Sequence, residues 1–158
     1  MSAKSPNESK AQMTVVMLPS DANPQGNVFG GVILKNIDLI AAVVAKRHTR
    51  TNIVTASIDK VNFLKPVLVG NALILTARLN YVGRSSMEIE VKVEAEDLEK
   101  GDRIPTGTAF VTAVALDENS RPTEVPRLLA ETEEDKRRFS EGEARMAQRV
   151  KELGKVKT

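Results

Sequence analysis

Cysteine and tryptophan are absent from this sequence of 158 residues, and histidine and tyrosine occur once each. Without cysteine there is no disulfide bond, no thiolate metal site and no cysteine nucleophile, and a single histidine cannot by itself form a metal centre. We therefore expect neither a bound metal nor a resident cofactor. Any chemistry has to use carboxylates, amides and hydroxyls.

The chain has neither the excess of positive charge nor the aromatic side chains that nucleic-acid binding needs. Lys and Arg number 23 against 21 Asp and Glu, which gives a formal charge of +2, and aromatic residues make up 3% of the chain. A basic stripe for phosphates and a set of platforms for stacking bases are therefore not expected.

Long apolar runs are missing as well. No run approaches the roughly 18 apolar residues of a membrane span, and the polar residues 1–11 lack the apolar core of a signal peptide. These absences predict a cytoplasmic protein that does not interact with a membrane.

The length fits one domain with a short extension at each end. Residues 1–11 are polar and rich in Ser, Lys and Asn, which predicts a flexible N-terminal arm. Residues 12–126 carry the apolar patterns and form the predicted folded domain. Residues 127–158 are highly charged with both signs mixed, which is typical of a solvated helical tail.

One long apolar segment and five shorter ones define the predicted fold. Residues 31–46 are apolar on nearly every side and precede a basic cluster, which favours a buried helix because this length exceeds the usual strand. Between residues 86 and 96, apolar side chains alternate with Glu and Lys, which predicts one strand face on the core and the other in water. Further strands are predicted at residues 12–18, 53–64, 72–81 and 106–117. The pattern predicts an α+β fold in which a curved antiparallel sheet packs on one long helix.

Asp38 is the residue that this fold accommodates least easily, because it lies in the middle of the apolar helix. Burying an unpaired carboxylate costs several kcal/mol. An ion pair with Lys35, one turn earlier, would explain it. A general base or nucleophile placed in a cleft would explain it too.

Gly30 and Gly31 come just before the helix, where the first free backbone amides can polarise a carbonyl or stabilise an oxyanion. A tight turn that only lets the helix begin also explains the pair. Asp38 lies about two turns later, about 10 Å along the helix axis from Gly31, so a substrate carbonyl and a water molecule fit between them. His48 ends the basic cluster, where capping of the helix is the common role.

Four motifs follow one another along residues 12–126. They are PSDANPQGNVFGGVILKNID (19–38), VTASIDKVNFLKPVLVGN (54–71), VGRSSMEIEV (82–91) and FVTAVALDENSRPTEVP (110–126). Together they resemble the acyl-coenzyme A thioesterase family with the hotdog fold. The resemblance implies a five-stranded antiparallel sheet wrapped around a long central helix. It also implies hydrolysis of acyl-CoA, in which coenzyme A is part of the substrate and the product.

The resemblance implies roles for individual residues. In this family the Asp of the central helix is general base or nucleophile, an Asn ahead of the FGG or HGG motif assists across a dimer interface, and the glycine amides polarise the thioester. The matching residues here are Asp38, Asn27, Gly30 and Gly31, with Phe29 where relatives can carry His. Residues that match the substrate-binding neighbourhood are Thr55, Phe63, Lys65, Pro66, Arg84, Ser85 and Ser86.

The resemblance also implies a homo-oligomer, at least a dimer and commonly a trimer of dimers. This chain has one hotdog unit with both Asn27 and Asp38, so a homodimer would contain two complete sites. The alternatives are a non-catalytic acyl-CoA sensor, a hotdog hydratase or dehydratase, and a purely structural oligomer. A hydratase needs a well-placed histidine, which His48 is not, and the presence of both Asn27 and Asp38 favours catalysis.

Overall fold

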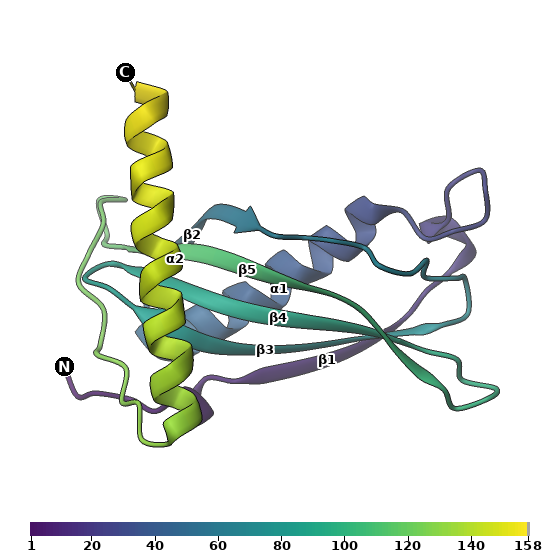
Figure 1. Ribbon diagram of the computed structural model, residues 1–158, viewed down its shortest axis with the longest axis horizontal. Coiled ribbons are helices and arrows are strands. Elements are labelled where there is room, and N and C mark those ends of the chain that lie inside the picture. The colour runs from purple at the N-terminus through teal and green to yellow at the C-terminus, as the bar shows by residue number, and fades with distance from the viewer. Residues whose placement is uncertain (158) are drawn as a thin grey trace.

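The structure, a computed structural model, describes residues 1–157 and the side chains of residues 1–154 (Figure 1). Five strands form one antiparallel sheet in the order β1-β3-β4-β5-β2. Their bounds are β1 (Ala11–Val16), β2 (Asn52–Asp59), β3 (Ala72–Val82), β4 (Ser86–Glu96) and β5 (Arg103–Leu116). The helices are η1 (Pro6–Glu8), η2 (Pro19–Asp21), α1 (Gly30–Thr49) and α2 (Glu133–Lys157). In this part of the chain, neither long helix is apolar enough over a sufficient length to span a membrane.

Helix α1 packs into the concave face of the sheet and supplies one side of the core. Ile37, Ile40 and Val44 are buried against the inward side chains of the strands. The helix ends where Arg50 adopts the left-handed conformation, with φ of 56°, and its N–H bonds the carbonyl of Lys46. A five-stranded antiparallel sheet curled around one long helix is the hotdog arrangement, so the predicted fold is confirmed.

The second strand is shorter than the sequence predicted. The apolar pattern suggested a strand over residues 53–64, but β2 ends at Asp59. Lys60 follows with φ of 57°, a left-handed conformation that turns the chain out of the sheet. Residues 60–71 then run as a loop past β5 to the start of β3, and this loop carries several of the predicted substrate contacts.

Helix α2 covers the face of the sheet opposite α1 and crosses the strands steeply (Figure 1). The expectation that the charged face of β4 lies in water holds only in part: Lys92 is exposed, but Glu88 is completely buried beneath α2. Arg145 and Arg149 of α2 both pair with Glu88, at 2.7 and 2.8 Å. At Gly142 the helix approaches so closely that a Cβ would lie 2.8 Å from the Cβ of Tyr81. The first five turns of α2 therefore form a packed layer rather than a solvated tail.

The first residues also pack on the domain, where the composition predicted a flexible arm. The backbone N–H of Lys4 bonds the carbonyl of Arg127, and the N–H of Leu129 bonds the carbonyl of Lys4. The Lys4 ammonium donates to the carbonyl of His48, and Pro6 is buried. Composition registers only the shortage of apolar side chains and misses these long-range hydrogen bonds. The division of the chain at residues 11 and 126 stays a prediction.

Candidate active site

Asp38 lies on α1 opposite the inward face of β2. The hydroxyl of Thr55 donates a hydrogen bond to Oδ1 of Asp38 at 2.6 Å, and both residues are half-buried. Among the described residues Asp38 forms no ion pair with Lys35, and its Oδ2 has no hydrogen-bond partner. The bond to Thr55 fixes the orientation of the carboxylate and leaves Oδ2 free of intramolecular hydrogen bonds among the described residues.

The first turn of α1 lies on the same helix as Asp38 and nearer its N-terminus. No side chain caps the helix start, and the amides of a first turn have no acceptor within the helix. A Cβ built on Gly31 would meet no atom within 4 Å, whereas one on Gly30 would lie 3.3 Å from Cε2 of Phe63. The aromatic ring of Phe63 therefore lies against the helix start, and the space beside Gly31 is open to a ligand.

The loop that carries Phe63 lies directly against β5. The N–H of Leu64 bonds the carbonyl of Thr106 at 2.9 Å. A Cβ on Gly107 would overlap the backbone oxygen of Asn62, so only glycine permits this approach. Phe63 and Leu64 are 44% and 74% exposed, and Lys65 and Pro66 follow them on the surface. These predicted contacts form one exposed, largely apolar rim beside the start of α1.

The loop before α1 contains two asparagines, Asn23 and Asn27, that are hydrogen-bonded to each other. The N–H of Asn23 bonds the carbonyl of Asn27 at 2.7 Å, and Oδ1 of Asn23 accepts the N–H groups of Gln25 and Asn27, both at 3.0 Å. Asn27 also pairs with Leu68 in an antiparallel bridge. Sequence reasoning singled out Asn27 and missed Asn23, although an asparagine ahead of a Pro-Gln-Gly turn is a turn signal.

The predicted coenzyme A contacts fall into two groups that a single chain does not bring together. The carbonyl of Ser85, in the turn with Arg84 and Ser86, bonds the N–H of Ala115 near the end of β5. The rim around Phe63 instead bonds Thr106 near the start of β5. The nine intervening steps of strand span about 30 Å at ~3.3 Å per residue. Within one chain, a ligand has to span about this distance to contact both groups.

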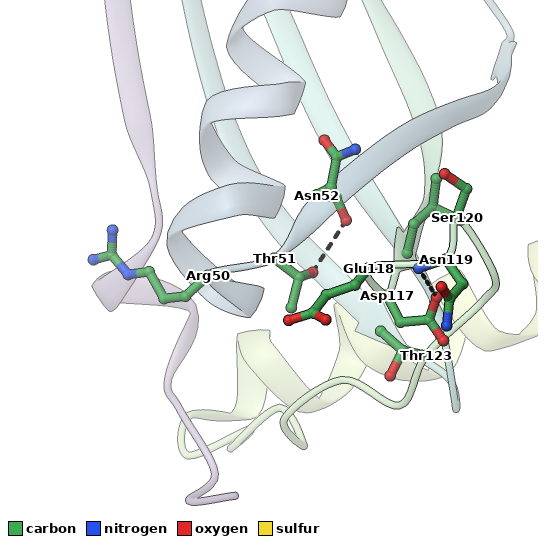
Figure 2. A pocket seen from close by; sticks show the side chains of 9 residues that line it. Arg50, Thr51, Asn52, Asp117, Glu118, Asn119, Ser120 and Thr123 are labelled. Carbon is green, nitrogen blue, oxygen red and sulfur yellow. Dashed lines mark hydrogen bonds between the residues drawn. The ribbon is translucent and has the colours of Figure 1, made fainter.

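The pocket in Figure 2, of about 640 Å³, lies at the other end of α1. Its walls are residues 50–52 and the turn at 117–120, with Leu116 and Thr123. The carboxylate of Asp117 in that turn is already engaged, since its Oδ1 accepts the N–H groups of Asn119 at 2.8 Å and of Arg121 at 3.0 Å. Arg50 points away from the turn (Figure 2). Asp38 is twelve residues from Arg50, about 18 Å along the helix, so the pocket is separate from the carboxylate.

His48 is completely buried and ties α1 to the segment after β5. Its Nε2–H donates to the carbonyl oxygen of Pro126 at 2.7 Å. Burial lowers the pKa of His48 below 6.5, against the opposing effect of the Pro126 carbonyl. Ten residues, about 15 Å of helix, separate it from Asp38, so His48 is structural. Residues 1–157 hold no cluster of three or more His, Asp or Glu side chains that suits a metal ion.

Comparison with known proteins identifies relatives over most of the chain. Residues 25–101 match the family model described as the thioesterase superfamily. An uncharacterized acyl-CoA thioester hydrolase of Bacillus subtilis is 45% identical over 128 residues, which cover 81% of this chain and 74% of that protein. The human cytosolic acyl coenzyme A thioester hydrolase is 39% identical over 142 residues, which cover 89% of this chain and 37% of the human protein. The chain therefore spans well under half of that longer relative.

Solved structures resemble this one along its whole length. A structure described as an apo-hexameric acyl-CoA thioesterase has a TM-score of 0.91 and 39% identity, covering 97% of this chain and 98% of that one. The acyl-CoA hydrolase of Staphylococcus aureus, solved with butyryl coenzyme A and coenzyme A, has a TM-score of 0.86 and 34% identity, covering 98% of this chain and 97% of that one. Further structures of the S. aureus protein carry alanine in place of one Asp, one Thr or one Asn.

Proposed function

Because this chain belongs to the thioesterase superfamily, we propose that it hydrolyses the thioester of an acyl-coenzyme A to a free carboxylic acid and coenzyme A. The observation that carries the proposal is the carboxylate of Asp38, held by a 2.6 Å hydrogen bond from Thr55 on the helix that begins at Gly30. The relatives named for this reaction support it.

Asp38 is the group that acts on the thioester, either as general base or as nucleophile. As a base, Oδ2 takes a proton from water while the water oxygen bonds the carbonyl carbon, the C–S bond then breaks, and the proton passes to the leaving thiolate. As a nucleophile, the carboxylate itself bonds the carbonyl carbon, the C–S bond breaks and coenzyme A leaves as its thiolate. Water then hydrolyses the resulting anhydride, which frees the acid, regenerates the Asp38 carboxylate and supplies the proton that the thiolate takes up. The amides of Gly30 and Gly31 stabilise the oxyanion in either case. The proposed reaction requires water and no cofactor.

Thr55 was predicted to bind substrate, and its contact with Asp38 supports a positioning role instead. Its hydroxyl donates to one carboxylate oxygen and so fixes the direction of the other. In the S. aureus relative the substituted Asp and Thr are seventeen residues apart, as Asp38 and Thr55 are here. This equal spacing supports the assignment of both residues to one unit.

The same comparison favours Asn23 over Asn27 as the residue whose amide assists Asp38. In the S. aureus relative the substituted Asn precedes the substituted Asp by fifteen residues. In this chain the residue fifteen before Asp38 is Asn23, whereas Asn27 is eleven before it. We therefore propose Asn23 as the first candidate for the assisting amide and keep Asn27 as the second.

A second subunit completes the site in this proposal. Leu39 and Val43, on the part of α1 that carries Asp38, are 50% and 42% exposed, and β2 beside them is an edge strand. Covering these side chains would remove water from the carboxylate and would bring the Arg84 turn of one subunit toward the Phe63 rim of another. The hexameric relatives support a homo-oligomer, and a trimer of dimers is the arrangement we propose.

We also propose that the enzyme acts in the cytoplasm on a small soluble substrate. The support is the cytosolic designation of three mammalian relatives, each of which matches 89% of this chain. The S. aureus relative was solved with butyryl coenzyme A, which makes a short acyl chain the first substrate to assay here.

Release of free thiol from a panel of acyl-CoA substrates tests the reaction, and the absence of cysteine in this chain removes any protein background. Asp38→Asn is expected to lower kcat by about 100-fold or more, since an amide cannot accept the proton. Thr55→Val is expected to lower kcat less. Lys35→Gln, one turn from Asp38 and exposed, is the matched control and should retain full activity. Binding of acyl-CoA with no thiol release would identify a sensor and overturn the proposal.

Asn23→Ala and Asn27→Ala, each assayed alone, decide which amide assists. The variant that loses activity is then mixed with Asp38→Asn chains and allowed to exchange subunits. Recovery of activity would show that the amide and the carboxylate come from different subunits, because a mixed dimer then contains one intact site. Absence of recovery after verified exchange would place both groups in one chain.

A further inference from the structure

The last turns of α2 extend past the edge of the sheet. The helix crosses the strands in their spatial order: Arg138 pairs with Glu90 on β4, the Arg145 guanidinium lies 3.9 Å over the ring of Phe110 on β5, and Arg149 pairs with Asp59 at the end of β2. β2 is the edge strand, and the C-terminal end of α2 extends past it (Figure 1). From Arg149 to Lys157 the helix rises about 12 Å, a little more than the width of two strands at ~4.8 Å each.

These turns present apolar side chains on an otherwise highly charged helix. Val150 and Leu153 are 62% and 61% exposed. Together with Met146 and Ala56 they line a cavity of about 340 Å³ between α2 and the outer face of β2. Val54, two residues before Ala56, is 46% exposed and points to the same face, because Thr55 between them points inward to Asp38.

Apolar surface is exposed on the inner side of the same edge as well. Leu39 and Val43 of α1 flank β2 on that side, as Val150 and Leu153 do on the outer side. A small ligand or a single helix could cover one face only. A protein that continues the sheet beyond β2 covers both, and pairing of two β2 strands around a two-fold axis is the simplest way to provide it.

We propose that residues 147–154 of α2 form an intersubunit strap, which docks on the outer sheet face of a second copy of this chain across paired β2 strands. Two-fold symmetry makes the contact reciprocal, so each dimer has two straps. Val150 and Leu153 pack on Val54 of the partner subunit, and this contact closes the cavity above Ala56. The strap rests on the dimer of the proposed function, but it adds a contact which that function does not require.

Site-specific crosslinking tests the strap directly, since the chain has no cysteine of its own. Chains with Val150→Cys and tagged, larger chains with Val54→Cys are mixed, allowed to exchange subunits and treated with a short bismaleimide. A covalent heterodimer on a denaturing gel is the expected result. The control replaces Val150→Cys by Leu98→Cys, at an equally exposed side chain, 55%, just after β4. Equal yields from both pairs would overturn the proposal.

A second measurement uses variants that keep the fold but remove the apolar contact. Val150→Asp together with Leu153→Asp is expected to raise the dimer dissociation constant at least tenfold in sedimentation equilibrium, and Leu98→Asp should leave it unchanged. Circular dichroism confirms that each variant is folded. An unchanged dissociation constant would overturn the strap.

The two proposals fail in different ways. If the wild-type chain sediments as a multiple of 17.2 kDa but Val150 yields no more crosslink than Leu98, the strap is wrong and the oligomer stands. If the wild-type chain sediments as a monomer and still releases thiol, the dimer and the strap both fail while the hydrolase assignment remains.

Discussion

Replacing Glu88 by Gln removes the charge that holds α2 on the sheet, and the cost follows from the geometry. Glu88 is completely buried and accepts hydrogen bonds from Arg145 at 2.7 and 3.0 Å and from Arg149 at 2.8 Å. The Glu88 carboxylate also raises the pKa of Arg145, which shows that it favours the charged guanidinium. Glu88→Gln leaves two guanidinium groups against a neutral amide of the same size.

The loss of unfolding free energy that we expect from Glu88→Gln lies near the lower end of the range for broken buried ion pairs. Breaking a buried ion pair by removing one partner costs about 3–5 kcal/mol. The side chains of Arg145 and Arg149 are 19% and 13% exposed, so some water reaches them, and Arg149 keeps its pair with Asp59. We therefore expect Glu88→Gln to lower the free energy of unfolding by about 3 kcal/mol.

Equilibrium unfolding in urea, followed by circular dichroism at pH 7 and at one fixed protein concentration, measures this loss. Glu134→Gln is the matched control, because Glu134 pairs with Arg138 on the same helix but is 55% exposed. An exposed pair of this kind contributes little to stability, because water and salt screen its charges. Equal losses for the two variants would refute the view that α2 is anchored by a buried carboxylate.

Two further predictions concern acid stability and the nucleotide end of the substrate. Burial lowers the pKa of His48, so below pH 6.5 the unfolded chain binds more protons than the folded one. The contribution of His48 to stability is therefore fully present above that pH and is lost as the pH drops through the histidine range. Urea unfolding from pH 7.5 to 5.5 should show this fall in the wild type and not in His48→Gln, and equal pH slopes for the two proteins would contradict the prediction. Arg84→Ala should raise KM and leave kcat nearly unchanged, because a distant phosphate contact stabilises ground state and transition state equally. Higher ionic strength should reduce the difference from wild type, and an unchanged KM would assign Arg84 to the turn alone.

The sequence predicted the fold well where the hydrophobic pattern of a segment depended only on the secondary structure of that segment. The alternation along β4 gave its bounds correctly, Ser86 to Glu96, and the long apolar segment located α1 within three residues at each end. The end of β2 was wrong because apolar residues continue through Phe63 and Leu64, while the turn depends on the backbone angle of Lys60. Hydrophobic patterns do not report backbone angles of single residues.

Alternation also shows that a strand has two faces, but not what covers the second one. Glu88 looked solvent-exposed for that reason. A signal for the covering helix was present in the tail, because Arg138, Arg145 and Arg149 are spaced by seven and four residues and so share one helix face. A row of arginines opposite a row of glutamates indicates a salt-bridged layer, but only when both rows are considered together.

The candidate site was only partly predictable for a related reason. Asp38 was conspicuous as a lone carboxylate in an apolar helix, but its hydrogen bond to Thr55 depends on how β2 faces α1. The choice between Asn23 and Asn27 depends on a loop whose turn uses both residues. The separation of the Arg84 turn from the Phe63 rim follows from the length of β5, and motif order along the chain carries no information about it.

The close approach at Gly107 links the width of the open space beside Gly31, at the start of α1, to a residue of β5 that does not border it. The backbone of Asn62 rests where a side chain at residue 107 would be, and the ring of Phe63 follows directly in the chain. A single added methyl group on β5 would push that backbone outward and carry the ring off the helix start. The size of the acyl group that fits beside the start of α1 can therefore change through a substitution on β5, because the main chain of the loop moves and no new contact to the ligand is made.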